Sequence, residues 1–250
     1  MTSATAQSLS PIELAWVRAQ TPENLSVTTV AMVCEGPLDP GCIKSRIEDR
    51  LLSEERFRQR MGHSHLPLAR PRWQEHERFQ LSDHFSYSAG ATRSSTDLAD
   101  VVSQLGSQPL NDELPLWQIH LVDHEKGGSV LIFRLHAAVA DSKAAHRQDV
   151  PTEDLELRAV ISLDLRRPGD PLTGTRAALA IFDGPARPQH LCERPITQFL
   201  WWPALTGDTA LGITLVTYGG QVQFGVSCDE ALDTDATALV ADMASAATEP

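Results

Sequence analysis

The sequence is poor in basic residues and has no long apolar run. The 250-residue chain has 21 Lys and Arg against 33 Asp and Glu, a formal net charge of −12. An acidic chain has no general attraction to phosphate backbones or anionic membrane surfaces, so nucleic acid is not an expected partner. No stretch approaches the roughly 18 apolar residues of a membrane span, and the first residues lack the features of a signal peptide. We therefore expect a cytoplasmic protein that does not span a membrane.

Cysteine is scarce, and the common catalytic motifs are missing. None of the four cysteines forms a CxxC pair, so a zinc or iron–sulfur cage is not expected. We interpret all four as small buried thiols in a reducing compartment; they are Cys34, Cys42, Cys192 and Cys228. The chain also contains no GxSxG, GxxxxGK[ST], GxGxxG or HExxH motif. The sequence thus predicts neither a metal nor a cofactor.

What remains is an ordinary globular composition, with 42% hydrophobic and 22% charged residues. Helices are predicted from Ser10, from Asp39, around 98–105 and from about Thr234, on capping residues and apolar periodicity. Residues 56–73 are interpreted as a connection. Strands are predicted at 26–34, 79–88, 116–123, 129–136, 159–166, 177–183, 195–202, 211–218 and 221–228. This order predicts a mixed α/β (α+β) fold with much antiparallel pairing.

The chain divides at a polar, acidic stretch, DVPTEDLEL, at residues 149–157. We interpret this stretch as a linker between an N-terminal half, 1–148, and a C-terminal half, 158–250. Most of the basic residues precede the linker.

The segment RLHAAVADS carries the most suggestive chemistry. The strand at 129–136 places Arg134 and His136 on one face and ends at His136, and Asp141 follows five positions later. Taken alone, the segment fits a buried histidine and a turn aspartate equally well. Arg134, Trp201 and Trp202 are the candidate ligand-binding residues. The two tryptophans are candidates to stack on a planar ligand, although adjacent strand residues more often place one ring in the core and one on the surface.

Several segments, in order, resemble the bacterial wax ester synthase/diacylglycerol acyltransferase (WS/DGAT) family, within the chloramphenicol acetyltransferase-like and condensation-domain superfamily. LHAAVADS lies where that family carries HHxxxDG, and PLNDELPLWQIHLVD is similar to its PLW segment. The other matching segments are SLSPIELAWVRAQTPEN, EGPLDPGCIKSRIEDRLLSEERFRQRM, ISLDLR and LGITLVTYGGQVQFGVSCDEAL. The resemblance implies a chloramphenicol acetyltransferase-like sheet with flanking helices.

The sequence departs from the family pattern in its motifs and its length. The second motif histidine, the general base of the family, is Ala137 here, and the final glycine is Ser142. An alanine cannot accept a proton, and general base catalysis is typically worth ~10²–10⁴ in rate. FDGP replaces the family's NVPGP, with Ile181 in place of its asparagine. The chain is also short for the family, so we expect a reduced C-terminal half.

Three functions are compatible with these features. The first is a remodelled acyltransferase-like fold that binds a hydrophobic small molecule near His136. Such a protein would cyclise or rearrange a polyketide-type chain in specialised metabolism by holding its reactive conformer. The second is a non-catalytic acyl or lipid binder, or the partner subunit of another enzyme. The third is residual O-acyl transfer, with His136 or another histidine as base.

Two structural expectations accompany these functions. In the superfamily the motif aspartate pairs with an arginine and holds the motif loop, which here implies Asp141 with Arg58; Arg56, Arg60 and Arg166 are alternatives. The reduced cover of the C-terminal sheet should expose apolar strand surface, and we expect a homodimer to bury it.

Overall fold

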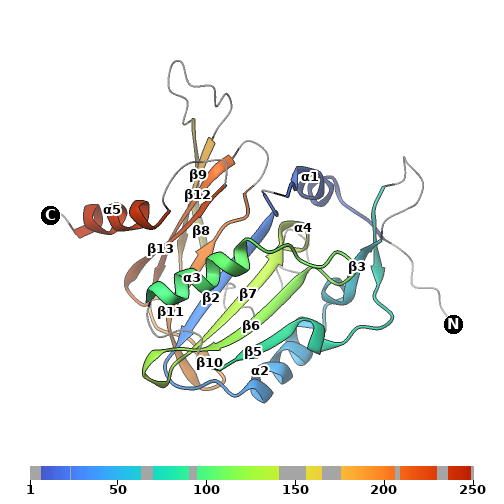
Figure 1. Cartoon of the computed structure of the whole chain (residues 1–250), viewed down its shortest axis with the longest axis horizontal. Helices are drawn as coiled ribbons and strands as arrows, with labels where there is room; N and C mark the ends of the chain where they lie inside the picture. Colours follow the sequence, from blue (N-terminus) through green and yellow to red (C-terminus); the bar gives the residue numbers. More distant parts are fainter. Residues whose placement is uncertain are drawn as a thin grey trace.

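The computed structural model describes residues 7–22, 24–62, 70–89, 95–140, 156–164, 176–205, 209–229 and 236–248. Its strands form three sheets with the orders β1-β4-β3, β10-β11-β2-β7-β6-β5 and β13-β12-β9-β8 (Figure 1). The mixed α/β class with much antiparallel pairing is therefore confirmed. None of the helices in these residues is long and apolar enough to cross a membrane.

The six-stranded sheet is the centre of the molecule. Its strands are β2 (Val27–Cys34), β5 (Phe85–Ser88), β6 (Trp117–Asp123), β7 (Ser129–His136), β10 (His190–Leu191) and β11 (Arg194–Trp202). All neighbours are antiparallel except β5 and β6, which are parallel. The hairpin of β6 and β7 matches the sequence prediction. Most side chains of β2 and β7 are buried because helices cover both faces of the sheet.

One face of this sheet is covered by α3 (Ser95–Gly106), which packs Leu98 and Val102 on Ala31, Val130 and Ile132. The opposite face packs on α2 (Pro40–Arg46) and on the π-helical turn η1 (Ile47–Leu51). At the start of α2, the Asp39 side chain accepts a hydrogen bond from the Cys42 amide, as its capping position predicts.

The N-terminal segment closes one end of this sheet. It contains β1 (Gln7–Ser8) and α1 (Pro11–Ala19), and α1 contacts the short helix α4 (Ala137–Ala140). The predicted capping box of α1 is present, since Glu13 N–H donates to Ser10 Oγ and Ser10 N–H donates to Glu13.

Residues 56–73 are more than the predicted connection. They contain most of the helical turn η2 (Glu55–Arg58), the strand β3 (Gln59–Gly62) and the start of β4 (Arg72–Glu75). The two strands pair with each other, and β4 also pairs with β1. Each strand spans only four residues, too few for a clear alternating pattern. The other short helical turns are η3 (Leu81–Asp83) and η4 (Glu125–Gly127).

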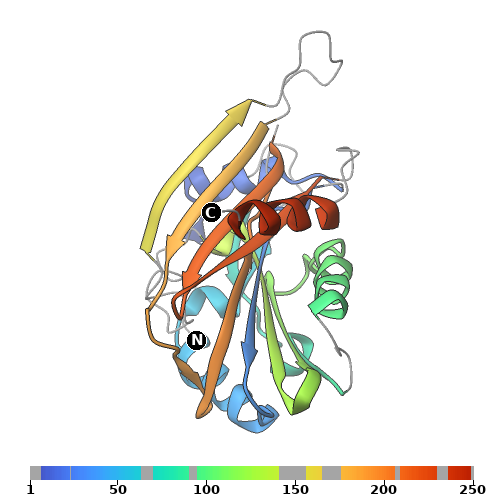
Figure 2. The same cartoon turned by 90° about the vertical axis from the view of Figure 1, so that its left-hand side faces the viewer.

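The four-stranded sheet contains β8 (Glu156–Asp164), β9 (Arg176–Asp183), β12 (Thr209–Tyr218) and β13 (Gln221–Cys228). The predicted hairpin of β12 and β13 is confirmed, and β12 pairs with β9 in parallel. The helix α5 (Ala236–Thr248) lies against this sheet and brings Leu239 and Met243 to Leu211 and Val226 (Figure 2).

A strand from the C-terminal half completes the N-terminal sheet. β11 pairs with β2 along Ile196–Trp202 and also contacts β12 and β13. Gly225 permits this approach, because a Cβ atom there would overlap the carbonyl oxygen of Trp201. The two halves are therefore joined through one shared sheet.

The prediction of four free cysteines was wrong. Cys42 and Cys192 form a disulfide between α2 and the turn that joins β10 to β11. These residues are 150 positions apart, and only the pairing of β11 with β2 brings them together. Cys34 and Cys228 are free, and burial raises the pKa of the Cys34 thiol to about 12.

Candidate functional site

The motif segment lies at the end of β7, where the strand turns into α4. The His136 amide donates to Leu116 O at 3.0 Å, and the Ala137 amide donates to Ser26 O at 2.8 Å. These bonds fix the strand end between β6 and the residue that precedes β2. Position 137, which the family resemblance assigns to the general base, is 3% exposed and bears only a methyl group.

Both ring nitrogens of His136 are occupied. The Ala138 amide donates to Nδ1 at 3.0 Å, so the neutral ring carries its proton on Nε2 and donates it to Gln20 Oε1 at 2.9 Å. The side chain is 2% exposed, and burial lowers the pKa of His136 to about 4. A second proton would have to displace the Ala138 amide, so the ring is held neutral by its surroundings.

A cavity of about 500 Å³ lies next to this strand end. Four segments line it: the turn before β2 with the start of that strand, the C-terminal half of α3, the chain after β11, and the end of β13. The cavity therefore lies between the two larger sheets, beneath α3. Its volume is within the range of small-molecule sites, about 300–1,000 Å³.

The described walls of the cavity are neutral. They combine apolar side chains such as Val102, Trp202 and Leu205 with hydroxyls, and they include no Asp, Glu, Lys, Arg or His. Such walls cannot compensate the charge of a buried ion, so they favour a neutral ligand with an apolar body. Cys228 also lines the cavity, and burial raises the pKa of its thiol.

Ser26 connects the cavity with the motif. Its side chain is 1% exposed, it lines the cavity, and its carbonyl oxygen accepts the Ala137 amide. Neither His136 nor Ala137 is among the wall residues. Ala137 thus lies directly behind the cavity wall.

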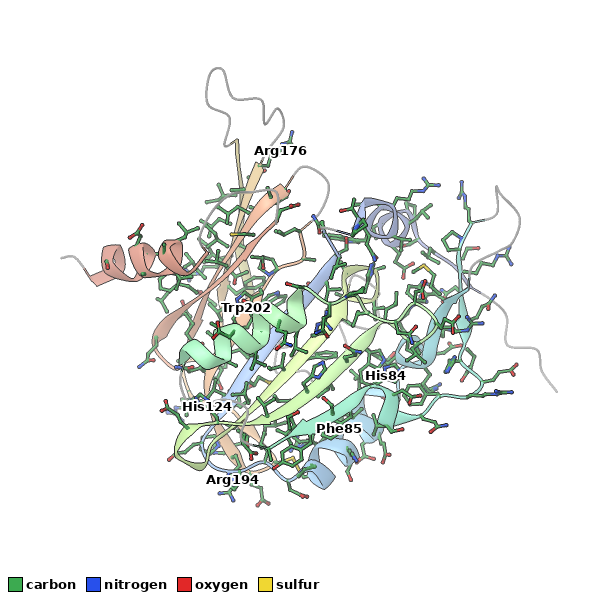
Figure 3. The ribbon with its side chains drawn as sticks, in the orientation of Figure 1. His84, Phe85, His124, Arg176, Arg194 and Trp202 are labelled. Atoms are coloured by element: carbon green, nitrogen blue, oxygen red, sulfur yellow. A yellow bond between two sulfur atoms is a disulfide. The ribbon has the colours of Figure 1, made fainter. Side chains whose placement is uncertain are left out.

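The two candidate tryptophans have different environments. Trp202 lines the cavity and packs with the residues under α3, and Figure 3 shows it between that helix and the four-stranded sheet. Trp201 stacks on Phe182, with ring centroids 4.5 Å apart. The structure therefore brings one of the two rings to the cavity.

Arg134 is buried away from the cavity. It is 1% exposed, donates to Gln118 Oε1 at 2.9 Å and to Gln108 O, and has a pKa lowered to about 10 by burial. Arg134 is not among the residues that line the cavity, so the structure does not bring it to this site.

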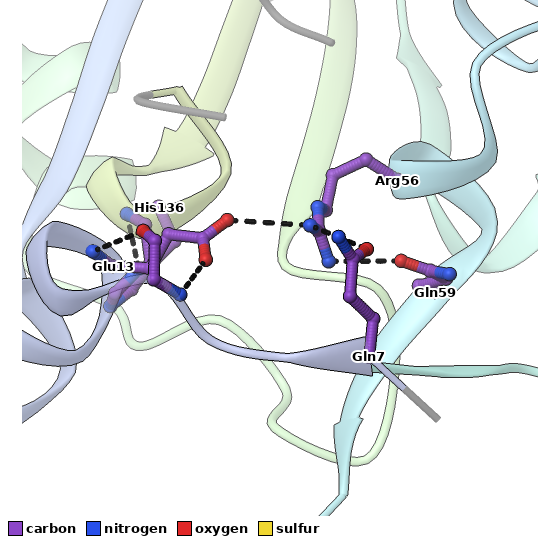
Figure 4. Close-up of polar contacts among 7 residues, drawn as sticks. Gln7, Glu13, Arg56, Gln59 and His136 are labelled. Atoms are coloured by element: carbon purple, nitrogen blue, oxygen red, sulfur yellow. Dashed lines mark hydrogen bonds and ion pairs between the residues drawn. The ribbon is translucent and has the colours of Figure 1, made fainter. Parts of the chain in front are cut away.

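A buried arginine–carboxylate pair joins the N-terminal segment to the helical turn η2. Arg56 and Glu13 lie 3.4 Å apart with side chains 9% and 5% exposed, and Arg56 also donates to Gln59 and Gln7 (Figure 4). The guanidinium lies over the ring of Trp73. Glu13 therefore supplies two connections, one to the start of α1 and one to Arg56.

Arg58, the expected partner of Asp141, is one-third exposed. Its side chain donates to Leu52 O and lies 3.6 Å from Glu75. Asp141 lies outside the described residues, as does most of the predicted 149–157 linker. The pairing of Arg58 with Asp141 stays a prediction.

Sequence reasoning missed the turn residues Asn24 and Ser26 and the thiol of Cys228 as parts of the cavity. No motif marks them, because they meet only through the pairing of β2, β11 and β13. Within the residues that the structure places, no group of three His, Cys, Asp or Glu is arranged to hold a metal ion.

Comparison with known proteins identifies the family. The description "Wax ester synthase/diacylglycerol acyltransferase catalytic domain" matches residues 9–147, and "WS/DGAT C-terminal domain" matches residues 176–249. A probable diacyglycerol O-acyltransferase, tgs3, from Mycobacterium tuberculosis is 32% identical over 101 residues. That match covers 40% of this chain and only 37% of the relative.

Solved structures agree in fold. A wax ester synthase/diacylglycerol acyltransferase from Marinobacter aquaeolei VT8 aligns with a TM-score of 0.65 at 15% identity, over 91% of this chain and 95% of that one. The family descriptions together span most of the sequence and both of its halves. The chain therefore belongs to the wax ester synthase/diacylglycerol acyltransferase family.

Proposed function

We propose that this chain binds a neutral, largely hydrophobic acyl-type molecule in the cavity under α3, without base-assisted acyl transfer at the motif. The observation that carries this proposal is Ala137 at the base position, with its amide bonded to the wall residue Ser26. A methyl group there leaves an attacking hydroxyl without a proton acceptor, which typically costs ~10²–10⁴ in rate.

Residual O-acyl transfer is the second candidate, favoured by the likeness to the Mycobacterium tuberculosis relative. It requires another base. His136 is a poor one, because its Nδ1 accepts an amide and burial lowers its pKa to about 4. The cavity walls, as far as they are described, offer no carboxylate or imidazole in its place. We therefore rank transfer below binding.

Cyclisation or rearrangement of a polyketide-type chain would be a catalytic extension of the binding role. A closed site accelerates such a reaction by holding the reactive conformer, and this needs no strong base. The neutral walls are compatible with that role, and so are the roles of a lipid binder or partner subunit. All of these functions begin with occupation of the same cavity.

Native mass spectrometry of the purified protein tests this occupation directly. We expect an additional neutral mass, released by organic solvent, in wild-type protein. Gly106→Trp, at the end of α3, would place a large ring at the cavity wall and should reduce the bound mass. Ile12→Trp is the control, because Ile12 is 53% exposed and does not line the cavity. Equal occupancy in the two variants would place the ligand elsewhere and contradict the proposal.

A further inference from the structure

One edge of the four-stranded sheet is open. β8 is the last strand in the order β13-β12-β9-β8, and among the described strands it pairs with β9 alone. Figure 2 shows β8, the yellow strand, at the outer edge of this sheet, while α5 lies on the face of the sheet. An edge strand presents unpaired N–H and C=O groups, which form a template for pairing with another strand. The outer edge of β8 is therefore a candidate interaction surface.

The middle of β8 lacks the features that normally block an edge. Proteins protect edge strands with charges, prolines and bulges. In β8 the register shift lies near the start of the strand, between Leu157 and Ala159. The five residues between Arg158 and Asp164, AVISL, include no charge and no proline. Ile161, at the centre of these five residues, is 42% exposed. This stretch of the edge is thus able to pair with another strand.

The charges at the two ends of this stretch are opposite in sign. At the start, the Arg158 side chain is 67% exposed and forms an ion pair with Asp183 of β9. At the end, Asp164 is in register with Arg176 of β9. Two antiparallel copies of β8 centred on Ile161 would place Arg158 of each copy beside the partner's Asp164. The charges would then alternate in sign across four strands, and opposite charges on adjacent strands stabilise their pairing.

The same charges select one register. In an antiparallel pair, opposite residues direct their N–H and C=O groups both toward each other or both away, so the two-fold axis of a symmetric pair passes through a residue position. An axis one position before Ile161 would place Glu156 beside the partner's Asp164, two like charges. An axis one position after it would leave Arg158 beyond the end of the partner's β8. Of these three registers, the one centred on Ile161 pairs opposite charges at both ends.

We propose that a second copy of this chain docks on β8, antiparallel about Ile161, so that the two four-stranded sheets join into one continuous sheet. The contact is isologous, because each copy contributes the same edge, and this is the geometry of the commonest protein dimers. It covers the exposed Ile161 of each copy with that of the other. The contact is separate from the cavity under α3 and does not depend on its occupation.

Cysteine cross-linking tests the position of the axis. Directly opposite residues of an antiparallel pair have Cα atoms about 4.5–5.5 Å apart, within the range of a disulfide. Ile161→Cys should therefore form a covalent dimer on mild oxidation, measured on a non-reducing gel. Ser162→Cys is the matched control, because Ser162 is also exposed. The two copies of position 162 would be diagonal neighbours, about 7–8 Å apart and too distant for a disulfide, so we expect at least about tenfold less cross-linking.

Charge reversal tests the complementarity. Arg158→Glu and Asp164→Lys each place two like-charged pairs in the contact, so each variant should dimerise at least about tenfold more weakly than the wild type. An equimolar mixture of the two variants should restore the dimer, because each changed residue then lies beside an opposite charge. Native mass spectrometry separates the mixed dimer from the two homodimers. Arg46→Glu, the same change of charge at an exposed position of α2, is the control and should dimerise as the wild type does.

Several outcomes would overturn the inference. A wild type that stays monomeric at high micromolar concentration would exclude the contact. Charge variants that dimerise as the wild type does, or equal cross-linking at positions 161 and 162, would place the interface elsewhere. A mixture that stays monomeric, with both variants folded by circular dichroism, would show that the substitutions act only within one copy, for example through the pair of Arg158 with Asp183. Each of these outcomes leaves the proposed ligand binding unaffected.

Discussion

Replacing His136 with glutamine should weaken the fold rather than remove a group that acts on a ligand. The ring is 2% exposed and bonded to Gln20 and to the Ala138 amide. Glutamine cannot reach both partners with the geometry of the ring, so at least one buried polar group loses its bond. We expect a loss of about 1–3 kcal/mol in the free energy of unfolding at pH 7.

The pH dependence gives the same substitution a second signature. Burial lowers the pKa of His136 from 6.5 to about 4, so between these values the unfolded chain binds the extra proton. The folded state therefore loses stability as the pH falls through this window. At pH 5 the loss from this one histidine is about 2 kcal/mol. His136→Gln removes this loss. The free energies of unfolding at pH 7 and at pH 5 should therefore differ by about 2 kcal/mol less in the variant than in the wild type.

Urea denaturation of the wild type and of His136→Gln at both pH values measures the two effects. His120, whose pKa burial also lowers to about 4, contributes equally to both proteins. The exposed His190 supplies the matched control, and His190→Gln should behave as wild type at both pH values. An unchanged free energy at pH 7 together with an unchanged pH difference would refute the structural role of His136.

Further predictions concern the surrounding scaffold. Glu13→Gln should lower the free energy of unfolding by about 3–5 kcal/mol, because it leaves a buried guanidinium without its carboxylate. Glu75→Gln, at the more exposed pair with Arg58, should lower it by under about 1 kcal/mol. Thermal melts compare the two variants, and equal losses would contradict this reasoning. A double-mutant cycle of Arg58→Ala and Asp141→Ala should show coupling if the two pair as the family resemblance implies, and additivity would exclude it. Cys42→Ser should lower the free energy of unfolding of oxidised protein by up to about 5 kcal/mol, because the lost disulfide joins residues 150 positions apart and restricts the unfolded chain. The same variant should abolish the effect of added reductant on the melting temperature. Light scattering at high micromolar concentration should show a homodimer that buries exposed apolar residues of the four-stranded sheet such as Ile161, and a strict monomer would count against it.

The sequence predicted the elements that carry a clear local pattern. The strands β2, β6, β7, β12 and β13 alternate or run apolar between turn residues, and their positions agree with the prediction to within two residues. The capping box of Ser10 and Glu13 was also predicted from the sequence, because its pattern spans only four residues. Local patterns of this kind depend on neighbours in the chain, and these are visible without a structure.

The features that the sequence did not predict depend on long-range pairing. β11 reads as a strand of the C-terminal half, yet its partner β2 lies more than 150 residues earlier. That pairing produces both the disulfide and the cavity. For the same reason, the buried pair of Arg56 and Glu13 was not predicted, since its two residues lie in different elements. The pair of Arg58 and Asp141 stays a prediction. The assignment of Ala137 to the base position rests on the family resemblance alone and stays a prediction.

Acyl transfer by the purified protein tests the central claim most directly. An isotope-labelled long-chain acyl-CoA is incubated with a fatty alcohol or a diacylglycerol, and the labelled ester is measured by mass spectrometry. With Ala137 at the base position, we predict no ester above the level without protein, although the cavity is occupied. Turnover comparable to that of a family enzyme would contradict the account, and its loss in a folded His136→Gln variant would assign the base to that residue.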